Sequence, residues 1–167
     1  NYEVQLTDIN RCIHHALEIV KVGKKSKDIH FETLLSDTLP VLPLVSDQIE
    51  QVFINLFINA VDAICEKAEQ RSKSPGAAKG TITISSTLRG SHLVVTVEDD
   101  GKGIAEDALP KIFEPFYTTK RVGEGTGLGL WVSYGIIKSF QGEIKVQSEQ
   151  GVWTKFTIAL PQQKNYT

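Results

Sequence analysis

The chain of 167 residues lacks methionine and has only two cysteines, no long apolar run and little net charge. Because no methionine stands even at position 1, we expect a piece cut from a longer protein. Cys12 and Cys65 show neither the density of a disulfide framework nor the spacing of a metal site, which favours a reducing compartment. No apolar stretch approaches the roughly 18 residues of a membrane span, and no basic-then-apolar leader is present. These absences predict a soluble, cytoplasmic fragment without membrane contact.

The balance of charge and hydrophobicity limits the remaining classes. Net charge is −2, and acidic and basic residues are interspersed, so no basic face is available to bind nucleic acid. Hydrophobic residues make up 41% of the chain, which at this length suits one globular domain with a buried core. We therefore expect a single domain that ends in a polar tail at residues 161–167.

The most informative stretch is a predicted helix from Asp47 to Ile64. At about 100° per residue, apolar side chains cover most of its surface. One narrow polar stripe remains, formed by Gln48, Gln51, Asn55, Asn59, Asp62 and Glu66. Asparagine is a mediocre helix former, and a buried amide without partners costs on the order of 1–3 kcal/mol. Asn55 and Asn59 therefore need polar partners, although a solvated helix edge would also explain them.

The other elements follow from local periodicity and turn residues. A first helix, capped by Asp8 or Thr7, is expected to expose His14 and His15 and to bury Ile9, Cys12, Ile13, Ala16, Leu17 and Val20. Strands are predicted at residues 28–35, 81–88, 92–99, 142–148 and 152–160. The pattern also predicts an extended segment at 39–45, a surface loop at 66–80 and a last helix that ends near residue 140.

Asp99 is the most informative acid. Alternation along the strand at 92–99 places it on the same face as Leu93, Val95 and Val97. A carboxylate on a buried face needs matching donors or becomes neutral at a cost. Gly101 and Gly103 follow at once and permit a sharp turn close to a ligand, although Asp-Asp-Gly is also an ordinary turn sequence.

Residues 104–123 form a long segment with little periodicity, which is typical of a lid or a binding loop. Within it, Phe113 and Phe116 are expected to anchor the loop. The glycine-rich stretch 123–130 then opens a helix, and free backbone N–H groups at a helix N-terminus suit phosphate. A flexible hinge is the alternative, since the spacing matches neither a dinucleotide fold nor a P-loop.

The order of these motifs is more specific than any one of them. Asn55 to Asn59, residues 99–103, residues 113–116 and residues 125–129 resemble the N, G1, F and G2 boxes of sensor histidine kinases. These kinases belong to the ATP-binding GHKL superfamily, shared with gyrase, MutL and a heat-shock chaperone. The resemblance covers residues 47–160, and the segment 116–120 is most similar to nitrogen-regulation-type kinases.

The resemblance implies an α/β fold of the Bergerat type. The expected architecture is a two-layer sandwich in which three helices cover one face of a mixed sheet of about five strands, with an ATP lid. Residues 1–46 would supply the connecting helix and the first strands, and residues 47–160 the ATP-binding catalytic core. Because self-association in this family comes from a helical domain outside this chain, a monomer is expected.

The resemblance also implies roles for single residues. Asn59 matches the asparagine that holds Mg²⁺, and Asn55 a polar position near the phosphates or the metal shell. Asp99 matches the acid that accepts from the adenine amine, Gly101 and Gly103 let the chain pass close to the base, and Thr154 closes the adenine pocket. The implied phosphate-facing residues are Thr119, Lys120, Gly125, Thr126, Gly127, Leu128 and Gly129. Of all these, Asn55 and Lys120 are the implied catalytic residues.

The implied activity is that of a protein-histidine kinase, which transfers the γ-phosphoryl group of ATP to a histidine on a separate dimerisation domain of the same protein. Neither His14 nor His15 is followed by the acceptor pattern, so we expect the acceptor outside this chain. ATP, ADP, Mg²⁺ and a downstream response regulator are the expected partners, and anchoring of the parent protein stays open. A GHKL-type ATPase is one alternative, although such relatives carry a glutamate where Asn55 stands. A catalytically silent nucleotide-binding scaffold is the other.

Overall fold

The computed structural model describes residues 3–71, 78–118 and 127–162. A five-stranded mixed sheet forms one layer, with strand order β2-β4-β5-β7-β6. Its members are β2 (Ile29–Leu35), β4 (Gly80–Arg89), β5 (His92–Asp99), β6 (Glu143–Glu149) and β7 (Trp153–Pro161). Strand β2 runs parallel to β4, and all other neighbours are antiparallel.

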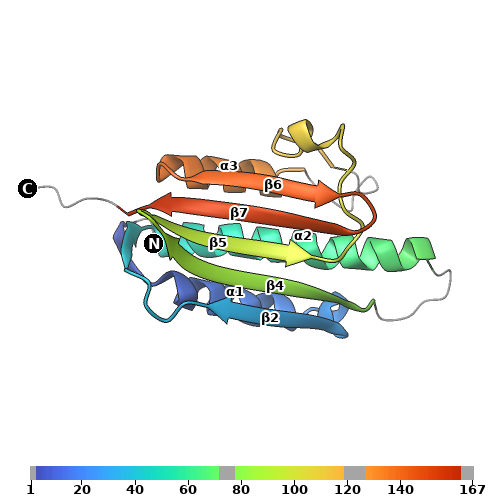
Figure 1. Ribbon diagram of the computed structural model, residues 1–167, viewed down its shortest axis with the longest axis horizontal. Helices are drawn as coiled ribbons and strands as arrows, with labels where there is room; N and C mark the ends of the chain where they lie inside the picture. Colours follow the sequence, from blue (N-terminus) through green and yellow to red (C-terminus); the bar gives the residue numbers. More distant parts are fainter. Residues whose placement is uncertain (1–2, 72–77, 119–126, 163–167) are drawn as a thin grey trace, which may run out of the picture.

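Three helices form the second layer and cover one face of this sheet (Figure 1). They are α1 (Ile9–Lys21), α2 (Ser46–Arg71) and α3 (Gly129–Ser139). Helix α2 lies between the other two and contacts both of them as well as β4 and β5. The predicted two-layer α/β sandwich with a sheet of five strands is confirmed. A separate two-stranded ladder of β1 (Gln5–Thr7) and β3 (Leu42–Leu44) joins the start of the chain to the segment before α2.

Helix α1 has the predicted start and the predicted buried face. The Asp8 carboxylate accepts a hydrogen bond from the Arg11 N–H and so caps the helix. All six residues of the expected apolar stripe are buried. His14 and His15 are exposed, as expected, and His15 Nδ1 lies 2.8 Å from Glu50 Oε1 of α2.

Helix α2 is longer than its sequence pattern predicts. It continues to Arg71, so the prediction of a surface loop from residue 66 is wrong for residues 66–71. Polar composition suggested a loop, but these residues are mostly good helix formers. Ala68 packs against the core, and the Lys67 ammonium donates to the Asp100 carbonyl at 3.0 Å. Tertiary contacts thus hold a polar helical turn that periodicity alone does not reveal.

The sheet follows the predicted alternation. In β5, Leu93, Val95, Val97 and Asp99 are all buried toward the helices. The hairpin between β4 and β5 turns at Gly90, which has φ of +62°, a conformation in which glycine meets no Cβ penalty. Among the described residues, no helix is both long and apolar enough to span a membrane.

Candidate functional site

A pocket of about 530 Å³ opens at the end of β5 that leads into residues 100–118. Five parts of the chain line it: helix α2, the last residue of β5, the segment 102–118, Leu130 of helix α3 (Gly129–Ser139), and residues 150–156 around the start of β7. Asn59, Asp99 and Thr154 are widely separated in the sequence, and all three reach this pocket. The fold therefore gathers these three predicted site residues around one cavity, together with the predicted Gly103.

Asp99 lies at the inner wall of the pocket and is only 4% exposed. One of its carboxylate oxygens accepts the Gly101 N–H at 2.9 Å. The pKa of this carboxyl is raised from 3.8 to about 7, chiefly by burial and in addition by the neighbouring charges of Asp100 and Glu98, while the Gly101 hydrogen bond and the charge of Lys67 oppose the shift. The second oxygen is the group that a ligand can approach. Asp99 is thus a buried acceptor with one hydrogen-bond partner among the described residues.

Gly101 and Gly103 are both buried at the turn that leaves β5. A Cβ on Gly101 would lie 2.7 Å from the Ala63 Cβ of α2, where the Lys102 N–H also donates to the Ala63 carbonyl at 3.0 Å. Gly103 has φ of +68°, and a Cβ there would lie 2.8 Å from the Gln150 Cα. Gly103 lines the pocket, whereas Gly101 packs against the helix beside it. Both glycines are therefore required by protein contacts, whatever ligand the pocket takes.

Thr154 sits on the neighbouring strand, directly opposite Asp99 in the β5–β7 register. It is 3% exposed and lines the pocket. Its hydroxyl lies 3.0 Å from the Ser148 hydroxyl of β6. Thr154 therefore places a second polar group beside Asp99 on the same face of the sheet.

The polar stripe of α2 divides into two parts. Asn59, Asp62 and Glu66 line the pocket. Asn59 is half-buried, and its amide makes no hydrogen bond to any part of the chain that the structure describes. Its carbonyl oxygen is accordingly available to a ligand.

Asn55 faces helix α3 and does not line the pocket. Its amide nitrogen donates to the Gly129 carbonyl at 3.1 Å and lies 3.2 Å from the Ser133 hydroxyl, while its oxygen accepts from Gln51 at 2.9 Å. The amide thus has polar partners, as expected, and they tie α2 to the first turn of α3. The geometry separates Asn55 from the cavity that Asn59 reaches one turn later.

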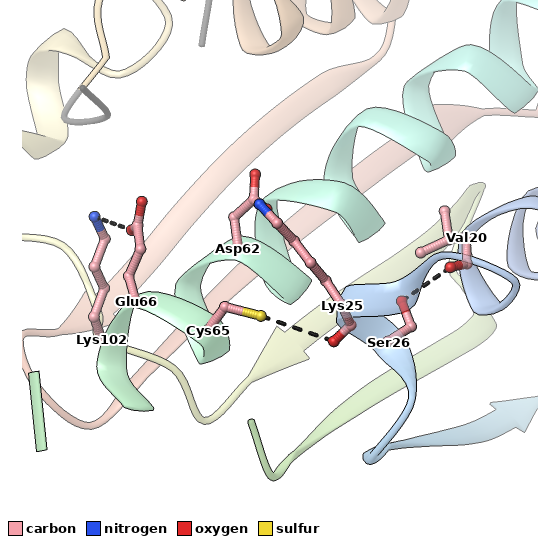
Figure 2. Close-up of polar contacts among 7 residues, drawn as sticks. All are labelled: Val20, Lys25, Ser26, Asp62, Cys65, Glu66 and Lys102. Atoms are coloured by element: carbon pink, nitrogen blue, oxygen red, sulfur yellow. Dashed lines mark hydrogen bonds and ion pairs between the residues drawn. The ribbon is translucent and has the colours of Figure 1, made fainter. Parts of the chain in front are cut away.

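Two lysines pair with the acidic side chains of α2 (Figure 2). Lys102 forms an ion pair with Glu66, and both side chains are about three-quarters buried. Lys25, from the short turn η1 (Lys24–Ser26), reaches to Asp62 with 3.4 Å between Nζ and Oδ1. The Cys65 thiol and the Ser26 hydroxyl fasten this turn by donating to the Lys25 and Val20 carbonyls. These pairs offset the negative charge of the helix at the cavity.

The segment 104–118 covers one side of the pocket and is irregular apart from the turn η2 (Leu109–Lys111). Phe113 anchors it, with ring centroids 5.5 Å from Tyr134 and 6.3 Å from Phe156. Phe116 is 73% exposed, so the prediction that it also anchors the loop is wrong. Its N–H instead donates to the Gly127 carbonyl at 2.9 Å. Phe113 therefore holds the segment through its ring, whereas Phe116 contacts Gly127 through its backbone and leaves its ring exposed.

Part of the predicted phosphate loop lies outside the described residues, namely Thr119, Lys120, Gly125 and Thr126. Gly127 is described and has φ of +70°, and a Cβ there would collide with the Phe116 backbone. Leu128 is the N-cap residue of α3, and Gly129 begins the helix. None of these three lines the pocket, although Leu130 does.

Three polar residues near the site are not predicted from the sequence. Ser133 is fully buried in the apolar helix α3 as the partner of Asn55. Ser148 shares an inward face with Ile144 and Val146, and alternation along β6 is the signal that could have revealed it. Lys102 follows Gly101 in the sequence, but no local pattern indicates its pairing with Glu66, which lies 36 positions earlier.

Comparisons with known proteins agree with this architecture. Residues 44–164 match the family described as histidine kinase-, DNA gyrase B-, and HSP90-like ATPase. The chain is 37% identical over 158 residues to the sensor histidine kinase ZraS of Escherichia coli (strain K12), covering 95% of this chain and 31% of that protein. It is 34% identical over 157 residues to sporulation kinase E of Bacillus subtilis (strain 168), covering 94% of this chain and 20% of that protein.

The solved structures show the same likeness. The catalytic domain of the histidine kinase ThkA, in a nucleotide-free form, superposes with a TM-score of 0.79 at 26% identity and covers 97% of this chain and 99% of that one. The chain spans less than a third of the length of either curated relative. Since ZraS and sporulation kinase E match it over at least 94% of its length, the chain belongs to the family of histidine kinase-, DNA gyrase B- and HSP90-like ATPases.

Proposed function

We propose that this chain is the ATP-binding catalytic domain of a sensor histidine kinase, which transfers the γ-phosphoryl group of ATP to a histidine on a separate dimerisation domain. The observation that carries the proposal is the pocket of about 530 Å³ that joins Asn59, Asp99 and Thr154. The pocket has a buried acceptor at one wall and, on α2 at another, an amide that makes no hydrogen bond to the described residues. Most catalysis of phosphoryl transfer is positioning and charge neutralisation, which such a pocket can supply.

The wall that holds Asp99 and Thr154 suits the adenine base. The exocyclic amine of adenine is a donor, and Asp99 has one carboxylate oxygen left after its bond to Gly101. Gly103 lines the same pocket and lets its own backbone pack closely against the backbone of residues 149–150. The hydrogen bond from Gly101 orients the carboxylate before a ligand arrives.

The phosphates would then extend along α2 toward Asn59. Mg²⁺ prefers hard oxygen ligands and commonly takes few from the protein and several from phosphates and water. The described residues contain no cluster of three acidic, histidine or cysteine side chains for a metal, and the free Asn59 amide fits an ion held jointly with the nucleotide. When bound, such an ion would neutralise phosphate charge. We further propose the phosphate-facing roles of Thr119, Lys120, Gly125, Thr126, Gly127, Leu128 and Gly129.

Asn55 enters the proposal differently from Asn59. Its amide is held by Gly129 and Ser133, so a direct contact with the phosphates requires it to exchange partners. A neutral amide is also unable to act as a general base for water. This supports phosphoryl transfer over the rapid hydrolysis of a gyrase-type ATPase.

The acceptor histidine and the partners complete the proposal. His14 and His15 are exposed on α1, and His15 is paired with Glu50, but neither carries an acceptor pattern. We therefore propose that the acceptor lies on the dimerisation domain of the parent protein and that a response regulator receives the phosphoryl group. The nitrogen-regulation-like subgroup, suggested by residues 116–120, remains part of this proposal, as does a cytoplasmic location.

Calorimetric titration tests nucleotide binding. ADP and a non-hydrolysable ATP analogue are titrated into the wild-type chain and into Asp99→Asn, with and without Mg²⁺. We expect binding in the micromolar range, strong weakening by the substitution, and metal-sensitive affinity for the analogue. Absence of binding to the folded wild type would contradict the proposal and favour a silent scaffold.

Phosphoryl transfer is tested with radiolabelled ATP and the dimerisation domain of the parent protein added in trans. We expect label on a histidine of that domain and none on the isolated chain. Rapid release of inorganic phosphate by the isolated chain would favour an ATPase instead. Label on His14 or His15 would contradict the placement of the acceptor.

A further inference from the structure

Three polar residues form one transverse row across the sheet at the wall of the pocket. Ser148 of β6 is the register partner of Thr154 of β7, and Thr154 is the register partner of Asp99 of β5. Directly opposed residues on adjacent strands point to the same face, with Cβ atoms about 5 Å apart. Thr154 and Asp99 line the pocket. Ser148 does not line it, but its hydroxyl contacts that of Thr154 from the neighbouring strand β6.

The hydroxyl of Ser148 has three partners, and their chemistry determines its orientation. The Trp153 carbonyl, 2.7 Å away, can only accept, so Ser148 donates its single proton there. The Ile104 N–H, 2.8 Å away, can only donate, so Ser148 accepts from it. A serine hydroxyl has one proton and two lone pairs, which leaves one lone pair for the third partner. The bond between Ser148 and Thr154 must therefore run from the Thr154 hydroxyl to the Ser148 oxygen.

This direction sets the polarity of the pocket wall. Since the Thr154 proton is committed to Ser148, Thr154 has only lone pairs to offer a ligand. Ionised Asp99 offers only lone pairs as well. Two adjacent acceptors match an amine with two N–H groups and repel a carbonyl oxygen in the same place, because unpaired buried acceptors are costly.

We propose that Ser148 is a positioning residue for base selection: it holds the Thr154 hydroxyl as an acceptor, so that the site prefers a purine with an amine at C6 over one with a carbonyl. The inference rests on the proposed nucleotide site and deepens it. Ser148 acts through Thr154 and does not touch the base. By accepting from Ile104, the same hydroxyl also ties the segment after β5 to the wall.

The test compares ADP with inosine diphosphate, which carries a carbonyl at C6, by calorimetry at pH 8, where Asp99 is mainly ionised. The wild type should prefer ADP. In Ser148→Ala the Thr154 proton is released and can turn toward a C6 carbonyl. The ratio of ADP to inosine diphosphate affinity should then fall about three- to tenfold, as expected for one hydrogen bond.

Further variants separate this role from a merely structural one. Thr154→Val should lower the ratio of ADP to inosine diphosphate affinity by a similar factor. The double variant with Ser148→Ala and Thr154→Val should show the same ratio as Thr154→Val alone, because the two residues act through one bond. Ser148→Thr keeps the hydroxyl and should restore the preference. Ser85→Ala is the matched control, since Ser85 pairs with the Thr96 hydroxyl on adjacent strands away from the pocket, and it should leave the ratio unchanged.

The outcomes are distinguishable. If Ser148→Ala weakens both nucleotides equally, Ser148 only supports the segment at Ile104 and the inference is overturned. If Ser148→Ala fails to fold, an unchanged ratio in Thr154→Val overturns it, while a lowered ratio there with recovery in Thr154→Ser supports it. A wild type that binds neither nucleotide would instead refute the proposed function itself.

Discussion

At the residue scale, Asp99 lies where burial disfavours its charged form but where its carboxylate can accept a hydrogen bond from a ligand. The carboxyl is 4% exposed and has one backbone donor. Burial is the largest cause of its raised pKa, and among the described residues no cationic side chain forms an ion pair with it. Natural sites often accept such a cost because an unsatisfied acceptor is what a ligand donor needs. The buried carboxylate of Asp99 therefore lowers the stability of the folded chain and at the same time offers an oxygen acceptor to a ligand.

The first prediction concerns the pH dependence of stability. The pKa of Asp99 rises from 3.8 to about 7 on folding, so the folded state binds the proton more tightly than the unfolded state. The Asp99 contribution to the free energy of unfolding should therefore fall between pH 4 and pH 7, by roughly 4 kcal/mol at most. Asp99→Asn, which keeps an acceptor for Gly101, should lose this component and be more stable than the wild type at pH 8.

Urea denaturation at pH 5 and pH 8 measures this effect. The wild-type chain and Asp99→Asn are compared at each pH, so that contributions from other titrating groups cancel. Equal pH dependence of the two proteins would show that Asp99 does not titrate abnormally in the folded state.

The second prediction concerns Gly103. Gly103 and Gly151 both have positive φ, but only Gly103 has backbone atoms where a Cβ would go. Gly103→Ala should therefore cost about 2 kcal/mol or more beyond Gly151→Ala, which suffers only the conformational penalty of roughly 1–2 kcal/mol. Denaturation of both variants gives the difference. Similar losses in both would mean that the turn at residues 149–150 moves aside without cost.

At the element scale, helix α2 serves two neighbours with one polar stripe. Its earlier part bonds to α3 through Asn55, and its later part faces the pocket through Asn59, Asp62 and Glu66. The stripe is continuous on the helix, but the neighbouring element changes along its length. The same helix face therefore holds α3 through Asn55 and, one turn later, presents to the pocket an amide that has no hydrogen-bond partner among the described residues.

The third prediction concerns this junction. Asn55→Ala removes the partner of the Gly129 carbonyl and of fully buried Ser133, which should cost about 1–3 kcal/mol. Ser133→Ala leaves the Asn55–Gly129 bond in place and should cost less. Hydrogen exchange should show lost protection in the first turns of α3 for Asn55→Ala and little change in α1.

Uniform loss of protection across all three helices in Asn55→Ala would contradict a local role for this residue. A second control is Gln51→Ala, because Gln51 bonds Asn55 from an exposed position on α2. That variant should leave the protection of α3 nearly unchanged.

At the scale of the whole molecule, the pocket joins parts of both layers. Asp99 and Thr154 come from the sheet, Asn59 comes from α2, and the segment after β5 covers one side. A ligand that contacts all of them binds to the folded state and not to the unfolded state. Ligand binding and global unfolding are consequently linked by mass action.

The fourth prediction is a thermal shift. ADP at about 100 times its dissociation constant should raise the free energy of unfolding by about 2.7 kcal/mol, which corresponds to roughly 5–10 °C in Tm for a chain of this size. The shift should be absent in Asp99→Asn at the same ADP concentration. An equal shift in both proteins would mean that ADP binds elsewhere.

Much of this architecture could be predicted from local patterns, since periodicity depends only on neighbouring residues. The buried stripe of α1, the hairpin at Gly90 and the five strands agree with it. The end of α2 was not predicted, because residues 66–71 are mostly polar. Their helical turn is held by the packing of Ala68 on the core and by the contacts of Lys67 with Asp100 and of Glu66 with Lys102, which a local pattern does not contain.

The sequence by itself determined that Asp99 faces inward, because alternation along a strand is a property of the strand alone. It also determined that the stripe on α2 is polar and that glycines follow β5. Only the tertiary structure decided which polar groups meet: Asn55 with Ser133, Ser148 with Thr154, and Thr154 with Asp99. The physical reason is that these pairings depend on helix packing and strand register, and both are set by the whole core at once.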